Sequence, residues 1–215
     1  MNRHEQLTRV YEAGIVAVVR APDPTHLIDV MKALADGGVT VAEVTLTVPN
    51  ALEVIREAKR VLGDTILLGA GTVLDTETCR AAILAGAEFI VSPTLNLDVI
   101  RLCHRYDKAI MPGCFTPTEI LTAWEAGADI IKVFPAECLG PTFFKAMRGP
   151  LPQIRMMPTG GVDLKTASEF LKAGACALGI GSQLVDPKMV AGRDFAGLTN
   201  LAKQYVEIVR STRSK

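Results

Sequence analysis

Short apolar runs alternate with longer amphipathic segments along the whole chain. The runs carry apolar side chains at consecutive positions, so they predict strands that are buried on both faces, as strands of parallel sheets are. Eight such strands are expected, at residues 15–20, 41–46, 66–72, 89–93, 109–113, 129–135, 155–161 and 177–182.

The segments between these runs have the periodicity of helices. In residues 25–34 the apolar side chains recur on one helical face, and the preceding Asp23 and Pro24 predict the N-cap and the first helical residue. Thr116 and Glu119 have the spacing of a capping box, which predicts the start of another helix. Helices between buried strands are typical of α/β proteins.

A glycine-containing phrase recurs before every second expected strand. "LAGAEFIV", "EAGADIIK" and "KAGACALG" are three versions of it, and "ADGGVTVAEV" is a looser fourth. Each interval spans two strand–helix units, so the pattern predicts an α/β fold of the (β/α)8 TIM barrel type. The alternative is an open doubly wound sheet, which more often has a glycine-rich loop after its first strand, and "VVRAPDP" has none.

The length of 215 residues suits one domain. We therefore expect a single domain over residues 1–215, with a helix at each end. The last residues, "RSTRSK", are locally basic and predict a short solvated tail after the C-terminal helix.

Composition excludes several classes of protein. There are 23 basic and 23 acidic residues and the net charge is 0, which argues against nucleic-acid and anionic-membrane partners. No run approaches the roughly 20 apolar residues of a membrane span, and the start of the chain does not resemble a signal peptide. The five cysteines lack CxxC spacing and indicate a reducing compartment, so a cytoplasmic protein is expected; they are Cys79, Cys103, Cys114, Cys138 and Cys176.

In barrel enzymes the active site lies at the carboxyl ends of the strands. The residues expected there include one acid, two cations, hydroxyl groups and glycine turns, but none of the three histidines. A histidine-rich or mixed carboxylate metal cluster is therefore not expected. The set comprises Arg20, Glu43 to Thr47, Thr72, Pro93, Gly113, Phe115, Lys132, Phe134, Thr159 to Gly161, Gly181 and Ser182.

Lys132 stands inside the apolar run "DIIKVFPAE". One interpretation is a lysine whose stem packs on the sheet while its ammonium reaches water. The other is a desolvated amine with a lowered pKa, which attacks a carbonyl group and forms a Schiff base. Phe134 would help to keep such a site dry.

Glu43 lies in another apolar strand, where an isolated ionised carboxylate is costly. It is interpreted either as a structural ion pair, with Arg20 or with Lys132, or as a general acid and base for the lysine or the substrate.

Glycine turns follow the last two expected strands, in "PTGGVD" and "GIGS". Gly160, Gly161 and Ser182 predict a phosphate or carboxylate site made of backbone N–H groups and a helix N-terminus, although each loop alone could be only a tight turn. "GAGTV" predicts a tight turn that presents Thr72 to the site. Pro93 either shapes a strand end or simply terminates the strand.

Several of these stretches, in the same order, resemble one enzyme family. "EVTLTVPNA", "GAGTV", "FIVSP", "MPGCFTPTE", "IKVFPAE", "GPTFFKAMRGPLP", "PTGGV" and "GIGSQLV" are similar to the 2-keto-3-deoxy-6-phosphogluconate (KDPG) aldolase and 4-hydroxy-2-oxoglutarate aldolase family, over nearly the whole chain. The resemblance implies a class I aldolase that needs no metal or other cofactor. It implies cleavage of 2-dehydro-3-deoxy-6-phosphogluconate to pyruvate and glyceraldehyde 3-phosphate, in the Entner–Doudoroff pathway, and a homotrimer.

The resemblance also assigns roles to individual residues. It implies that Lys132 forms the Schiff base and that Glu43 is the general acid and base. It places Thr72, Pro93 and Phe134 around pyruvate and Arg20 near the pyruvyl carboxylate. The phosphate site would be formed by Gly160, Gly161 and Ser182.

One position departs from the family pattern. Many members have arginine where Thr47 stands, in "EVTLTVPN", so the substrate's anionic end is expected to be bound differently and selectivity for phosphorylated sugar acids to be lower. The galactonate epimer of the substrate stays an alternative. So do a phosphosugar isomerase or epimerase, and a phosphoester-binding protein without catalysis.

Overall fold

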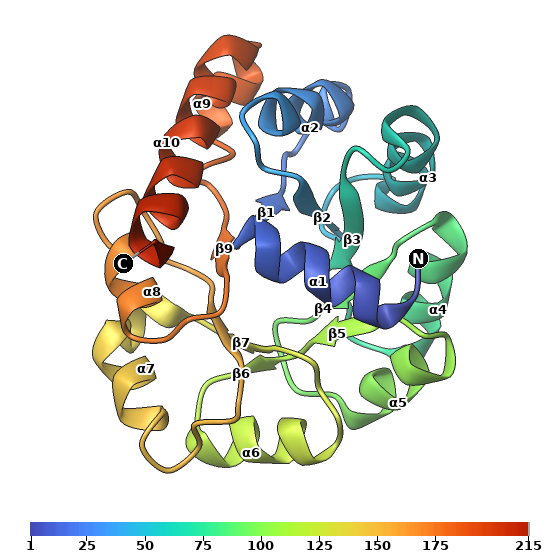
Figure 1. Cartoon of the computed structure of the whole chain (residues 1–215). Coiled ribbons are helices and arrows are strands. Elements are labelled where there is room, and N and C mark those ends of the chain that lie inside the picture. Colours follow the sequence, from blue (N-terminus) through green and yellow to red (C-terminus); the bar gives the residue numbers. More distant parts are fainter. Residues whose placement is uncertain (215) are drawn as a thin grey trace.

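The computed structural model describes residues 1–214, which form a parallel α/β fold with helices outside the strands (Figure 1). The strands are β1 (Ile15–Val19), β2 (Val41–Thr45), β3 (Leu67–Gly71), β4 (Phe89–Val91), β5 (Ala109–Met111), β6 (Gly113–Cys114), β7 (Ile131–Val133), β8 (Met156–Pro158) and β9 (Leu178–Ile180). The helices are α1 (Arg3–Ala13), α2 (Leu27–Asp36), α3 (Ala51–Leu62), α4 (Thr76–Ala85), α5 (Leu97–Arg105), α6 (Pro117–Glu125), α7 (Gly140–Met147), α8 (Ala167–Lys172), α9 (Pro187–Ala191) and α10 (Phe195–Arg213), with a 3-10 turn at Ala136–Cys138.

Every expected strand segment contains a strand, and the strands pair in two sections. A curled six-stranded sheet has the order β5-β4-β3-β2-β1-β9, and a three-stranded sheet has the order β6-β7-β8. All pairs are parallel, as in the register of Ala17 with Ala42. The α/β class predicted from the sequence is therefore confirmed, whereas a single continuous ladder of eight strands is not observed.

Proline divides the fifth expected strand. Pro112 separates β5, which pairs with β4, from β6, which pairs with β7. Proline has no backbone N–H to donate to a ladder, so a strand tends to break at that position. The Pro112 carbonyl still accepts a hydrogen bond from the Lys132 N–H at 3.0 Å, so β7 stays paired with the segment that connects β5 and β6. At the other border of the small sheet, Thr159 and Gly179 form a parallel bridge.

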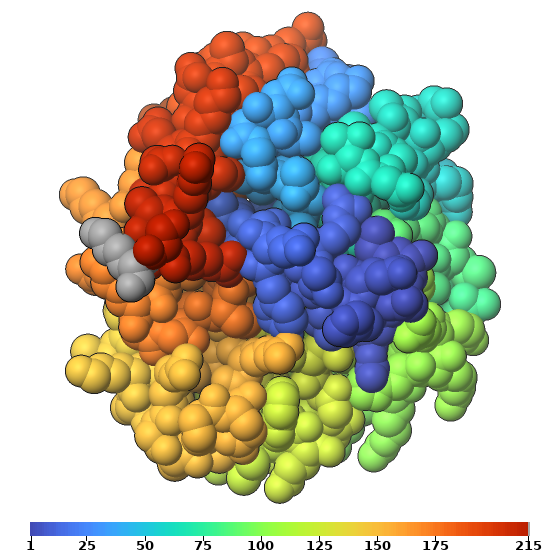
Figure 2. Space-filling model, viewed as in Figure 1, coloured from blue at the N-terminus to red at the C-terminus, as the bar shows by residue number. Residues whose placement is uncertain are grey.

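Buried apolar side chains lie on both sides of the strands. The larger cluster fills the space between the strands and the surrounding helices. The smaller one contains side chains from several neighbouring strands, including Val16, Val41, Leu67 and Phe89, together with Val10 of α1. Figures 1 and 2 show α1 crossing the centre of the face where the strands begin, so this helix covers the amino end of the second cluster.

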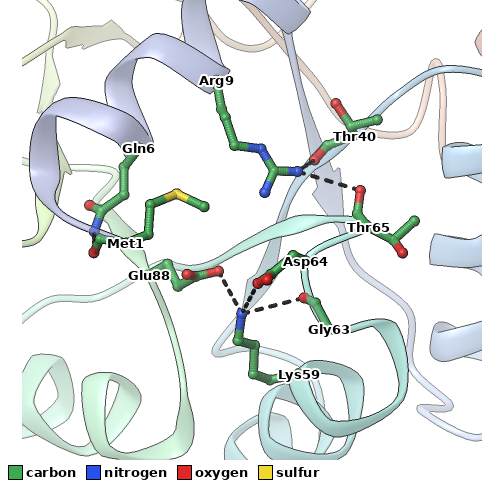
Figure 3. A network of polar contacts seen from close by, with 9 residues as sticks. All are labelled: Met1, Gln6, Arg9, Thr40, Lys59, Gly63, Asp64, Thr65 and Glu88. Atoms are coloured by element: carbon green, nitrogen blue, oxygen red, sulfur yellow. Dashed lines mark hydrogen bonds and ion pairs between the residues drawn. The ribbon is translucent and has the colours of Figure 1, made fainter.

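Polar contacts fasten the loops on this amino-terminal face (Figure 3). The Lys59 ammonium donates to the Glu88 carboxylate and the Asp64 carboxylate, both at 3.1 Å. Arg9 of α1 donates to the carbonyl oxygens of Thr40 and Thr65 at 3.5 and 3.4 Å. These contacts join α1, α3 and the beginnings of β2, β3 and β4, far from the carboxyl ends of the strands.

Two predicted helix starts have different outcomes. The capping box of α6 is confirmed, because the Thr116 hydroxyl accepts from the Glu119 N–H and the Glu119 carboxylate accepts from the Thr116 N–H. The prediction for α2 is wrong, since this helix begins at Leu27. Asp23 instead accepts hydrogen bonds from Thr25, which closes a turn before the helix.

The C-terminal segment is also more ordered than expected. Helix α10 continues to Arg213, whose guanidinium donates to the carbonyl oxygens of Tyr11 and Cys176 at 2.6 and 2.7 Å. Residues 210–213 therefore belong to α10 and not to a tail after it, although Arg210, Ser211, Arg213 and Ser214 are exposed to solvent as predicted. Lys215 lies outside the described residues. None of the helices in residues 1–214 combines the length and the apolar character needed to cross a membrane.

Candidate active site

The carboxyl ends of the strands border a cavity of about 470 Å³. Seven of the residues expected at the strand ends line it, and they come from the ends of β1, β7, β8 and β9. These are Arg20, Phe134, Thr159, Gly160, Gly161, Gly181 and Ser182.

Lys132 is the central residue of β7 and only 5% exposed. Its flanking residues Ile131 and Val133 are fully buried, so the lysine stem is held by a well-packed strand. The ammonium nitrogen lies 5.1 Å from the centre of the Phe134 ring. Burial lowers the pKa of Lys132, the Glu43 carboxylate opposes this shift, and the nearby Arg20 adds to it. The interpretation as a lysine that reaches water is wrong.

Glu43 is the central residue of β2 and only 1% exposed. Neither of its carboxyl oxygens has a hydrogen-bond partner. Burial raises the pKa of Glu43, while the positive charges of Lys132 and Arg20 oppose the shift. Burial therefore favours the protonated form of this carboxyl group.

The two buried groups are close enough to influence each other's pKa without forming a salt bridge. Within residues 1–214, no ion pair of 4.0 Å or less joins Glu43 to Lys132 or to Arg20. The structural ion pair is thus not observed. The site therefore contains a buried amine and a buried carboxyl group. Burial shifts the pKa of each in the direction that favours its neutral form.

Gly71 lies directly beside the Glu43 carboxyl group, which fits there because glycine has no side chain. A Cβ atom at Gly71 would lie 2.6 Å from Cδ and Oε1 of Glu43. Contacts this short do not occur between real side chains, so any larger residue at this position would displace the carboxyl group. The sequence had suggested only a tight turn for "GAGTV", and the role of Gly71 in placing Glu43 was missed.

Substitution of Gly71 by alanine is expected to lower kcat by about 100-fold, because shifts of about 1 Å in a catalytic group have effects of this size. Gly71 is not among the residues with positive φ, so its backbone conformation tolerates alanine. Steady-state cleavage assays check this, with Gly149→Ala as the control because Gly149 lies in an exposed turn. Wild-type turnover in Gly71→Ala would contradict the role.

The glycine loops present free backbone donors to the cavity. Gly160 and Gly161 have φ values of 89° and 70°, which favour glycine. The N–H groups of Gly161, Ser182 and Gln183 donate to no atom of residues 1–214. A helix N-terminus was also expected here, but α9 is already capped: the Asp186 carboxylate accepts from the N–H groups of Lys188 and Met189. Because Asp186 already accepts from the first N–H groups of α9, the free N–H donors at the cavity belong to the loops after β8 and β9.

Three further predicted residues lie around this edge. Thr72 has a φ of 62° and is half-buried, as expected for the turn after β3. The Pro93 carbonyl lies so near Gly113 that a Cβ there would be 2.2 Å from it. Thr47 is exposed, and its hydroxyl is 2.9 Å from that of the buried Thr45.

Thr159 is a cavity residue that was expected at a strand end but was given no role from the sequence. It is 6% exposed, lines the cavity, and its hydroxyl oxygen has no hydrogen-bond partner. A buried hydroxyl without a partner is costly, so such a group in a cavity is suited to a ligand. Its place directly before Gly160 was the available signal.

One histidine lies nearer than predicted. His26 lines a second cavity that also borders Arg20 and Thr47. Among the described residues, no three or more His, Cys, Asp or Glu side chains are grouped so as to hold a metal ion.

The fold and the buried lysine–carboxyl pair define an α/β enzyme whose lysine is suited to attack a carbonyl group. A family model described as "Aldolase: KDPG and KHG aldolase" matches residues 7–201. The chain belongs to this family of KDPG and 4-hydroxy-2-oxoglutarate (KHG) aldolases.

Individual relatives span the same length. The 2-dehydro-3-deoxy-phosphogluconate aldolase of Treponema pallidum is 37% identical over 95% of this chain and 96% of its own. The 2-dehydro-3-deoxy-6-phosphogalactonate aldolase of Escherichia coli is 33% identical over 91% of this chain and 96% of its own. The solved structure of KDPG aldolase from Legionella pneumophila, with pyruvate captured as a covalent carbinolamine, is 27% identical, with a TM-score of 0.85 over 90% of this chain and 95% of that one.

Proposed function

We propose that this chain is a class I aldolase that cleaves 2-dehydro-3-deoxy-6-phosphogluconate to pyruvate and D-glyceraldehyde 3-phosphate, and also 4-hydroxy-2-oxoglutarate to pyruvate and glyoxylate. The observation that carries the proposal is the buried Lys132 with its lowered pKa beside the unpaired Glu43. The carbinolamine captured in the Legionella relative and the names of the curated relatives support it.

Cleavage begins with Lys132. Its neutral amine adds to the C2 carbonyl of the substrate, and the resulting carbinolamine loses water to give a protonated imine. Glu43 supplies the proton that turns the departing hydroxyl into water and is left as a carboxylate. The imine then attracts the electrons of the neighbouring C3–C4 bond.

Glu43 also serves the bond-breaking step. Its carboxylate accepts the proton of the C4 hydroxyl, the C3–C4 bond breaks, and the electron pair moves into the imine to give an enamine. The aldehyde leaves, Glu43 returns its proton to C3, and water releases pyruvate from Lys132. Phe134 beside the amine keeps the surroundings apolar, which maintains the reactive neutral lysine.

The remaining residues bind the two ends of the substrate. Arg20 is proposed to hold the pyruvyl carboxylate, with Thr72, Pro93 and Thr47 around the pyruvyl part. The free N–H groups of Gly161 and Ser182, with the Gly160 turn and the Ser182 hydroxyl, are suited to the phosphate.

Borohydride reduction in the presence of pyruvate tests the proposal directly. It is expected to add one pyruvyl group to the peptide that contains Lys132, found by mass spectrometry. Absence of the label, or its presence on another lysine, would contradict the mechanism. An isomerase, an epimerase or a phosphoester-binding protein needs no imine and would give no label.

The rate of this trapping is expected to rise with pH and then level. Only the neutral amine attacks, and burial lowers the pKa of Lys132 below its ordinary value of 10.5, so the plateau begins below that pH. At pH values above the raised pKa of Glu43, its carboxylate raises the pKa of Lys132. In that range the removal of this charge in Glu43→Gln is expected to move the rising limb to lower pH. A shift to higher pH would show that the sign of this interaction is wrong.

The unpartnered hydroxyl of Thr159 is proposed to donate to a substrate hydroxyl. Thr159→Val is expected to lower kcat/KM by roughly three- to tenfold, the effect of one hydrogen bond. Thermal stability is expected to be unchanged or higher, since a buried hydroxyl without a partner is removed. Measurement of kcat/KM for the gluconate and the galactonate epimer shows whether Thr159→Val lowers the value for one epimer more than for the other. Equal kcat/KM in both proteins would contradict this contact.

The broader architecture is proposed on the same grounds. The parallel bridge between Thr159 and Gly179 and the chain continuity through Pro112 support closure of the two sheet sections into a (β/α)8 barrel. A single domain over residues 1–215, a homotrimer, a reaction without metal or other cofactor, and a cytoplasmic location stay predictions. Oligomeric state is measured by light scattering, and turnover by assays in a chelator.

A further inference from the structure

A second cavity adjoins the first at Arg20. Its volume is about 680 Å³, against about 470 Å³ for the proposed substrate cavity, and Arg20 and Pro187 line both. Its walls are the loop between β1 and α2, Thr47, and the segment of α9 with the turn that follows (Figure 1). The lining residues are Arg20, Ala21, Pro22, Asp23, His26, Thr47, Pro187, Val190, Ala191 and Arg193.

The second cavity has two guanidinium groups and one carboxylate. Arg20 and Arg193 are exposed, and among residues 1–214 neither forms an ion pair of 4.0 Å or less. The carboxylate of Asp23 accepts from the Thr25 N–H at 2.9 Å and from the Thr25 hydroxyl at 2.5 Å; these hydrogen bonds and, to a smaller extent, the charge of Arg193 lower its pKa, so it offsets one of the two positive charges. The cavity therefore offers an excess of positive charge and several N–H donors in fork geometry.

The other part of the lining is apolar. Ala21, Pro22, Pro187, Val190 and Ala191 contribute hydrocarbon surface to the same space. Two guanidinium groups beside hydrocarbon surface match a ligand that has an oxyanion at one end and a compact apolar body at the other.

We propose that the second cavity binds a small organic oxyanion, a carboxylate or a phosphate ester that carries a compact apolar group. Arg193 and Arg20 bind the oxyanion, and the wall formed by Val190 and Ala191 packs against the apolar body. Because Arg20 lines both cavities, an anion in the second one draws this guanidinium away from the first and weakens substrate binding. Only this coupling rests on the proposed aldolase function.

Calorimetric titration with benzoate and phenyl phosphate tests the site. Both probes have the same ring, so their relative affinities identify which oxyanion the site prefers. Arg193→Gln removes a guanidinium, and Ala191→Leu fills the cavity without changing charge. Each is expected to weaken binding of the preferred probe by about tenfold or more, the effect of losing a charged hydrogen bond or its space.

Two controls locate the probe. Lys188→Gln removes one positive charge from α9 at an exposed residue outside the lining, and binding is expected to change less than twofold. Ser182→Ala alters only the first cavity, and probe binding is expected to be unchanged. If Ser182→Ala weakens binding while Arg193→Gln does not, the probe occupies the substrate cavity and the second site is excluded. An equal effect of Arg193→Gln and Lys188→Gln would also exclude it.

Kinetic assays test the coupling. Saturating probe is expected to raise the apparent KM for cleavage several-fold in the wild type and not in Ala191→Leu, whose basal activity is expected to be normal. An unchanged KM in the wild type would overturn the coupling. Pyruvate trapping on Lys132 separates the two proposals: its failure overturns the aldolase and leaves the binding data intact, whereas successful trapping with no effect of Arg193→Gln overturns the second site alone.

Discussion

Substitution of Lys132 by methionine is expected to reduce cleavage by roughly 10⁴-fold or more, because the amine that is proposed to form the covalent intermediate is lost. Methionine has a similar length and suits a position that is only 5% exposed. Steady-state assays on both substrates, together with borohydride trapping, measure the loss. Turnover within tenfold of the wild type would show that the reaction does not pass through this lysine.

The stability of the same variant separates a reactive amine from a structural charge. Removing one partner of a buried ion pair costs about 3–5 kcal/mol, since the other charge is left unpaired. No such pair is formed by Lys132 in residues 1–214, and burial favours the neutral amine. The free energy of unfolding of Lys132→Met is therefore expected to equal or exceed that of the wild type. Lys203→Met, at an exposed position of α10, is the control.

Substitution of Glu43 by glutamine is expected to lower kcat by about 10²- to 10⁴-fold, the usual contribution of a general acid and base. Glutamine keeps the size of the side chain but can neither give nor accept the proton. Pyruvate trapping on Lys132 is expected to persist at a reduced rate, because the amine remains. Full activity in Glu43→Gln would assign the proton transfers to another group.

The free energy of unfolding of Glu43→Gln tests the protonation state of the Glu43 carboxyl group. Burial raises the pKa of Glu43, which favours the neutral acid, and a neutral amide of the same shape replaces it at little cost. Denaturant unfolding is expected to show a change of less than about 1 kcal/mol. A loss of several kcal/mol would indicate a buried ionised carboxylate that stabilises the fold.

The strands could be predicted from the sequence because their signal is local. Residues 15–19 are apolar at every position, and 41–46 are apolar except for Glu43 and Thr45, a pattern that a strand buried on both faces explains. The division of the sheet at Pro112 could not be predicted in the same way, since it depends on which neighbours pair on each side. Asp23 and Pro24 have the sequence pattern of a helix start. In the structure the Asp23 carboxylate instead accepts a hydrogen bond from the nearby Thr25 hydroxyl, and α2 begins later, at Leu27.

The buried pair of Lys132 and Glu43 could be predicted because an ionisable residue in an apolar strand is rare and therefore informative. Lys132 and Glu43 both stood out in this way, and burial of both is confirmed. The importance of Gly71 and Arg193, and the role of Thr159 among the residues expected at the strand ends, could not be found by the same reasoning. Their importance depends on what lies opposite them in space: the Glu43 carboxyl group, a cavity, and a second arginine contributed by a distant segment.

The anchoring of the C-terminal helix has a practical consequence for the whole molecule. Arg213 is bound to the carbonyl of Cys176, just before β9, and Gln6 near the other end donates to Asp107 and accepts from Ala109, where β5 begins. Helix α1 and the end of α10 are thus held on the face where the strands start, away from Lys132 and the two cavities described above (Figure 1). If the enzyme were attached to a support through either terminal helix, the face where the strands begin would lie against the support. The proposed active site, at the carboxyl ends of the strands, would face the solution.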